Sequence, residues 1–181
     1  MVDKVLDLAI TYNGNDVKRI NHLLKVFSFA HYIGIMESCD DQLQTTIEIA
    51  ALLHDIGIHE AERKYNSSAH NWQEIEGPLV AKELLKNVNL DAVILDRVLF
   101  LIGHHHSYAA IDGLDFQILV EADFLVNIFE DGMNEVSIKD IREKIFKTKS
   151  GTGLLEQLYL GGEVNSLLAT VFPKKMPITD N

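Results

Sequence analysis

The stretch Ala50-Ala51-Leu52-Leu53-His54-Asp55-Ile56-Gly57 joins an apolar helix directly to two ionisable side chains. Ile47, Ala50 and His54 are spaced three and four residues apart, so they lie on one helical face that should be buried. Asp55 follows at once, and the closing glycine lets the chain turn away. A carboxylate beside a buried imidazole is costly unless a positive charge compensates it. A divalent cation would do so, because imidazole nitrogen and carboxylate oxygen are ordinary metal ligands.

Length and composition set limits on what the chain can be. Its 181 residues suffice for one domain with a substantial core. The formal net charge of −11, without any basic block, argues against a nucleic acid polymer as partner. The single cysteine, Cys39, excludes an intrachain disulfide framework and fits a reducing compartment. With no signal-peptide core and no apolar run long enough for a bilayer, we expect a soluble cytoplasmic protein without a membrane partner. The sequence leaves a homo-oligomer open.

Helical periodicity dominates the chain, and no stretch alternates with a sustained period of two, so we expect a single-domain, all-α bundle. The expected helices cover about residues 2–11, 17–37, 42–54, 73–86, 92–105, 115–130 and 137–147. Residues 56–72 are polar and predict a long irregular loop, a kind of segment that is often functional. Gly151 and Gly153 predict a further loop.

Five of these helices carry a ligand-type side chain on a face that should be core. The residues are His22, the pair His54 and Asp55, Glu76, the pair His104 and His105, and Asp123. Each has a simpler explanation when taken singly, such as a hydrogen-bonded core histidine, a carboxylate at a helix N-terminus or a solvated helix end. Together, five helices would have to aim such groups inward independently, and this favours a shared ion.

Asp123 is the hardest of these residues to explain without a ligand. It shares an apolar stripe with Leu119 and Val126, and burying an unpaired carboxylate there would cost several kcal/mol. The alternative to a metal is an ion pair with Arg97 or Arg19.

The order of these residues resembles the HD superfamily of metal-dependent phosphohydrolases. The segment RINHLL supplies His22, LLHDIG supplies His54 and Asp55, and EADFL supplies Asp123. The resemblance implies an all-α bundle in which these four residues bind one metal ion. It covers about residues 16–131, which leaves a C-terminal helical extension over 132–172 and a loosely held tail over 173–181.

Some branches of the superfamily bind a second metal, and two further segments resemble their layout. EIEGPLVA places Glu76 where those branches have a histidine, and LIGHHHS offers His104 and His105. The resemblance then implies that Asp55 bridges the two ions. The segments HDIGIHEAERKY, QEIEGP and GHHHSY, with FQILVEADFLVN further on, also look like bacterial HD proteins that are uncharacterised or predicted hydrolases. No Gly-Tyr-Pro motif follows His106, which argues against a cyclic-di-GMP phosphodiesterase.

The resemblance implies a metal-dependent phosphohydrolase that acts on a small phosphorylated metabolite or nucleotide through a metal-activated water. One or two divalent ions are expected, with Fe, Mn, Co, Mg or Zn all compatible with the ligands. Lys64 and Arg63 are expected to hold the substrate phosphate, or else to be solvated surface charges. His106 is expected to donate a proton or to point to solvent.

Two other functions fit the same residues. HD-type scaffolds that hold two irons can activate oxygen, and histidine-rich ligation is compatible with iron. A non-catalytic module that binds a nucleotide is the third reading, and the complete ligand set speaks against it.

Overall fold

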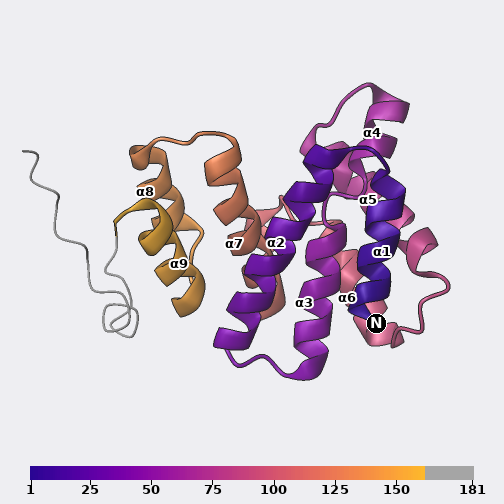
Figure 1. Ribbon diagram of the computed structural model, residues 1–181, viewed down its shortest axis with the longest axis horizontal. Coiled ribbons are helices and arrows are strands. Elements are labelled where there is room, and N and C mark those ends of the chain that lie inside the picture. Colours follow the sequence, from indigo (N-terminus) through magenta and orange to yellow (C-terminus); the bar gives the residue numbers. More distant parts are fainter. Residues whose placement is uncertain (162–181) are drawn as a thin grey trace, which may run out of the picture.

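The computed structural model describes residues 1–161, which form α-helices and one short 3₁₀ turn without any strand (Figure 1). The predicted all-α fold is therefore confirmed for this part of the chain. The helices are α1 (Val2–Asn13), α2 (Val17–Met36), α3 (Asp41–Leu53), α4 (Ile58–Tyr65), α5 (His70–Leu85), α6 (Ala92–Ile102), α7 (Leu114–Glu130), α8 (Glu135–Lys144) and α9 (Lys149–Tyr159), with the 3₁₀ turn η1 at Tyr108–Ala110.

Helix α3 is the centre of the packing. It contacts α1, α2, α6 and α7, so it is covered on several sides rather than on one face. Its second half, Ile49 to Leu53, is almost entirely shielded from solvent. Each leucine buried in this way stabilises the fold by about 1.5–3 kcal/mol. His54, directly after this run, is therefore buried as predicted, whereas Asp55 is partly exposed.

Helix α7 is the second buried element, and it packs against both α2 and α3. Most of its side chains are buried. Asp123 lies in the middle of α7 and is 6 % exposed. Neither of the two arginines considered as an ion-pair partner contacts Asp123. Arg97 pairs with Asp112 and Asp115. Arg19 pairs with Asp16, which caps α2, and with Glu62 of α4.

The predicted loop over residues 56–72 is wrong, because most of it is helical. Helix α4 fills residues 58–65, and α5 begins at His70. Only Ile58 and Ala61 of α4 are buried. A short helix with so few buried apolar residues shows no clear helical periodicity in the sequence, so the helix was not predicted. Helix α4 packs against α5, and Asn66 ends it in a left-handed conformation.

The loop predicted at Gly151 and Gly153 is also wrong, because both residues lie inside α9. Thr148 caps this helix by accepting a hydrogen bond from the Gly151 amide. The carboxylate of Glu121 occupies the space that a side chain at position 151 would need. Gly151 is therefore explained by close packing rather than by a turn.

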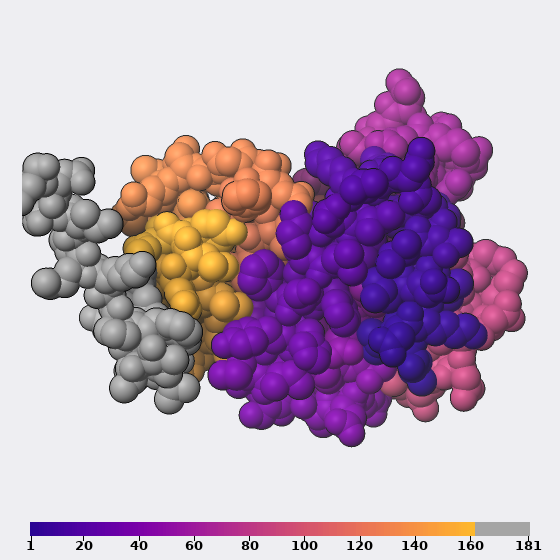
Figure 2. Space-filling view, viewed as in Figure 1, coloured from indigo at the N-terminus to yellow at the C-terminus, as the bar shows by residue number. Residues whose placement is uncertain are grey.

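Helices α8 and α9 lie at one end of the molecule, and α1, α4 and α5 lie towards the other (Figures 1 and 2). Helix α9 contacts both α2 and α7, and the Tyr159 hydroxyl donates to the Leu125 carbonyl over 2.6 Å. These helices begin the C-terminal extension expected over 132–172. Its remainder and the tail expected over 173–181 lie outside the described residues. Within residues 1–161, no helix combines the length and apolarity that crossing a membrane would require.

Gly57 has a different role from the predicted one. Its backbone is ordinary right-handed helical, with φ −76°. A Cβ atom at this position would lie 2.5 Å from the Gly77 nitrogen and 2.7 Å from the Gln73 oxygen. The absence of a side chain therefore allows α5 to approach the turn after His54 and Asp55.

Replacing Gly57 with alanine should destabilise the protein by about 2–3 kcal/mol, because rigid backbone must move apart. Urea unfolding followed by circular dichroism measures this. Gly153→Ala is the matched control, since nothing lies within 4 Å of a Cβ there and the helix should gain up to about 1 kcal/mol. Equal stability of the two variants would contradict the close approach.

Candidate metal centre

Three helices bring four of the predicted ligands together. His22 lies in the second turn of α2, His54 and Asp55 directly follow α3, and Asp123 comes from α7. The His22 Nε2 atom lies 3.2 Å from His54 Nε2 and 3.3 Å from Asp123 Oδ1. Asp55 Oδ2 lies 3.6 Å from both imidazole nitrogens. His22, His54 and Asp123 are all buried, and their ligand atoms lie within 4.8 Å of one another.

The hydrogen bonds of the two imidazoles show what is missing between them. His54 Nδ1 donates to the Ala51 carbonyl over 2.9 Å, and His22 Nδ1 donates to Glu130 Oε2 over 3.1 Å. In the neutral rings both Nε2 atoms therefore carry lone pairs, and these lone pairs face each other. Such an arrangement is repulsive unless a proton or a cation lies between or beside the nitrogens. Carboxylates of Asp55 and Asp123 next to them make a cation the better match.

The ionisation of the cluster shows the same demand for positive charge. Burial opposes protonation of His54, but the nearby carboxylates of Asp55 and Asp123 outweigh it and raise the His54 pKa to about 9. Burial likewise opposes ionisation of Asp123. Hydrogen bonds and charge from His22 and His54 nevertheless hold the Asp123 pKa well below its usual range. The cluster therefore favours a positive charge at this position, which a divalent ion could supply.

A second group of ligand atoms adjoins the first and consists of Asp55, His105 and His106. His105 Nδ1 donates to the Ile102 carbonyl over 2.9 Å, so its Nε2 lone pair is free and lies 3.4 Å from Asp55 Oδ1. His106 Nε2 lies 3.3 Å from the Gln73 side-chain oxygen, which leaves Nδ1 as the free atom. Both free nitrogens are buried without a hydrogen-bond partner. Buried unpaired polar atoms are uncommon, and imidazole lone pairs beside a carboxylate fit a metal ion.

Asp55 is a member of the second group, and its carboxylate also lies next to the first. Oδ2 faces His22 and His54, and Oδ1 faces His105. A carboxylate placed in this way could contact an ion in either group, and the bridging role implied by the resemblance stays a prediction.

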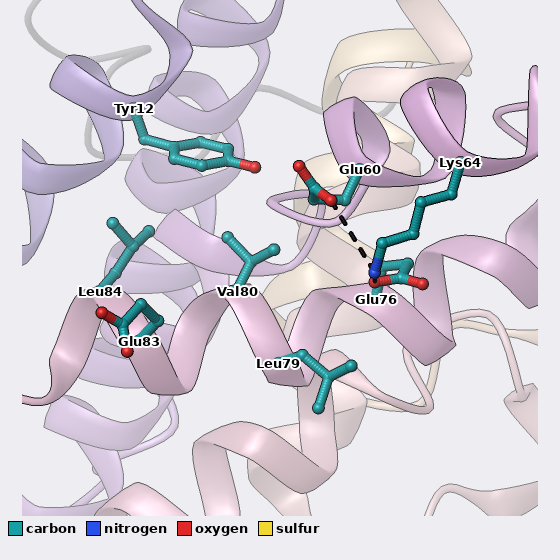
Figure 3. A pocket seen from close by; sticks show the side chains of 8 residues that line it. All are labelled: Tyr12, Glu60, Lys64, Glu76, Leu79, Val80, Glu83 and Leu84. Carbon is teal, nitrogen blue, oxygen red and sulfur yellow. Dashed lines mark hydrogen bonds and ion pairs between the residues drawn. The ribbon is translucent and has the colours of Figure 1, made fainter.

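The structure does not bring Glu76 to this centre. Its carboxylate accepts hydrogen bonds from Lys64 Nζ over 2.5 Å and from the Tyr65 hydroxyl over 2.9 Å. Both donors come from α4, so Glu76 is part of the α4–α5 contact. Lys64 and Glu76 line a separate cavity of about 400 Å³ between α1, α4 and α5 (Figure 3). Arg63 binds Glu60 on the surface, so neither predicted phosphate-binding residue lies at the centre.

His104 also lies outside both groups, whereas His106 lies inside one. Helix α6 ends at Ile102, and the turns that follow do not keep helical spacing. His104 Nδ1 therefore donates back to the Phe100 carbonyl over 2.7 Å, and its ring stacks on Phe100. His106 instead stacks on His70 and packs beside His105.

Three positioning residues were not found from the sequence. Gln73 contacts His106, and Glu74 accepts hydrogen bonds from the His106 amide and the Ser107 hydroxyl. Gln73 lies three residues before Glu76, which is one helical turn along the same face of α5. The prediction therefore chose about the right face of the helix but a residue one turn too far along it. Glu130 orients His22 and is itself paired with Lys25. It lies seven residues after Asp123, and extending that stripe by two helical turns would have found it.

A polar cavity of about 410 Å³ opens beside the centre. His22 and Asp55 line it, together with residues from the start of α2, the start of α5 and the end of α7. The cluster is therefore accessible to a small molecule.

Comparison with known proteins places this chain in a family. The HD domain model matches residues 19–148, and the chain belongs to the HD domain family. Among solved structures, it is similar to a predicted HD superfamily hydrolase from an uncultured Thermotogales bacterium. The two share 25 % identity with a TM-score of 0.63 over 88 % of this chain and 85 % of the other. No match to a curated protein reaches significance. These findings support a metal-dependent hydrolase family.

The two neighbouring histidines provide a direct test of the second group. His106→Ala should lower the amount of bound Mn²⁺ by about one ion per chain, because it removes one of the three ligand atoms. His104→Ala is the matched control and should keep the wild-type amount. Metal analysis after dialysis measures both, and a loss in the His104 variant alone would contradict the assignment.

Glu130→Gln should weaken binding of the first ion by about 10–100-fold, because His22 would lose the carboxylate that orients its ring. Competition with a chromogenic chelator measures the affinity. Glu48→Gln is the control, since Glu48 accepts a similar hydrogen bond from His31, which lies outside both groups. Equal affinities for the two variants would remove Glu130 from this role.

Proposed function

We propose that this protein is a metal-dependent phosphohydrolase that acts on small phosphorylated substrates. The observation that supports this most is the pair of adjacent ligand groups beside an accessible polar cavity, with Asp55 of the second group 3.6 Å from His22 and His54 of the first. His22, His54 and Asp123 would hold one ion, His105 and His106 would hold the other, and Asp55 would contribute to both. When bound, the ions would provide an activated water and offset the negative charge on the phosphoryl oxygens.

The residues of the chain would position the substrate. Lys18 lines the cavity and makes no ion pair or side-chain hydrogen bond in the described part of the chain, so its ammonium group is available for a phosphate. Arg19 also lines the cavity, but its guanidinium is held by Asp16 and Glu62. Lys18 thus takes the role expected for Lys64.

His106 is better suited to binding an ion than to storing a proton. Burial, followed by the neighbouring imidazoles of His105 and His70, lowers its pKa to about 3. The ring is therefore neutral near pH 7, and its buried Nδ1 keeps a free lone pair. The proton-donor role expected from the sequence is not part of this proposal.

Asp55→Asn should abolish release of phosphate from p-nitrophenyl phosphate by the Mn²⁺- or Co²⁺-loaded protein, because both ligand groups lose an oxygen charge. The same variant should retain less metal on dialysis. Asp96→Asn, an exposed site on α6, should match the wild type in both assays. Full phosphatase activity of the Asp55 variant would contradict the proposal, and oxygen consumption by iron-loaded protein without phosphate release would favour an oxygenase.

A further inference from the structure

The cavity beside the metal centre differs in chemistry from an ordinary pocket for an organic ligand. Twelve residues line it, and Ile58 alone among them has an aliphatic side chain. Pockets for drug-like ligands and cofactors are lined mainly by apolar and aromatic side chains. The cavity between α1, α4 and α5 shows the contrast within this protein, because Leu79, Val80 and Leu84 form one of its walls (Figure 3).

The cavity also lacks a surface on which a nucleobase could stack. No phenylalanine, tyrosine or tryptophan is among its twelve lining residues. His70 lines the cavity, but one face of its ring is already covered by His106, with 3.7 Å between the ring centroids. Stacking on an aromatic side chain is a main source of affinity for bases. The lining therefore disfavours a nucleotide.

The wall formed by the end of α7 instead offers hydrogen-bond acceptors. Asn127, Glu130 and Asp131 line this wall. The side chains of Asn127 and Asp131 have no hydrogen-bond or ion-pair partner within residues 1–161. The C-terminus of a helix carries partial negative charge, so this end of the cavity attracts donors such as hydroxyl groups and repels a second phosphate. Ser68 adds a hydroxyl from the segment before α5.

From these features we infer that the substrate is a small monophosphate ester of a polyhydroxylated molecule, such as a sugar or polyol phosphate. This inference rests on the proposed phosphohydrolase function. The metal centre and Lys18 receive the single phosphate. Asn127 and Asp131 accept hydrogen bonds from the hydroxyl groups. With one unpaired lysine on its walls, the cavity does not neutralise a polyphosphate chain.

Phosphate release from a matched panel tests the inference. The substrates are sorbitol 6-phosphate, glucose 6-phosphate, AMP, dAMP and ATP, with p-nitrophenyl phosphate as a generic ester. We expect kcat/KM for a polyol or sugar phosphate to exceed that for AMP and dAMP by at least about tenfold, with ATP the poorest. Preference for a nucleotide would overturn the inference and leave the phosphohydrolase proposal standing. Failure to hydrolyse any ester, p-nitrophenyl phosphate included, would overturn both.

A variant at the α7 wall tests the placement of the hydroxyl groups. Asp131→Ala should raise KM for the preferred polyol or sugar phosphate about tenfold, because a charged acceptor is lost, while kcat changes little. Its kcat/KM for AMP should change much less. Asp96→Ala removes an exposed aspartate elsewhere and should leave both constants unchanged. An unaltered KM for the polyol or sugar phosphate in the Asp131 variant would contradict the placement.

Discussion

Two imidazole nitrogens that face each other at 3.2 Å are the constraint around which this protein is built. They come from α2 and α3, and Asp123 of α7 lies beside them, so the three most tightly packed helices all reach the same point. Neutral rings would repel there, and buried carboxylates need a counter-charge. Apolar packing elsewhere holds the helices together strongly enough to maintain this geometry. The facing nitrogens and the nearby carboxylates together favour a bound cation where the three helices meet.

The outer residues of the centre show how the neighbouring helices hold it. Backbone carbonyls fix the tautomers of His54 and His105, whereas a carboxylate fixes that of His22. Helix α5 fixes the turn that carries His106 from the other side, through Gln73 and Glu74. Gly57 permits this close approach of α5. The orientation and tautomer of each of these histidines are therefore set by groups that are not ligands themselves.

The sequence predicted the all-α fold, and three of the residues that it singled out lie close together, because both outcomes depend on helical periodicity. His22, His54 and Asp123 lie on stripes of buried helices, where spacing determines direction. The wrong predictions concern residues whose direction is not determined by helical spacing. His106 follows the end of α6, where turns replace helix, so His104 was favoured in its place. Gln73 and Glu76 lie one turn apart on α5, and only the packing of α4 against α5 decides which of them reaches the centre. Helix α4 was missed because two buried side chains are too few to reveal a period.

Helix α9 shields a buried carboxylate of α7, that of Glu121, from solvent. This carboxylate is completely buried two residues before Asp123, and it accepts hydrogen bonds from Gln117, from the Lys147 amide and from Thr148. Helix α9 then covers it, with Gly151 leaving the necessary room. The family match stops at residue 148, immediately before this cover. A chain shortened to the matched boundary would open the carboxylate to water next to the turn of α7 that carries Asp123, so the HD segment depends on a helix beyond its own limits.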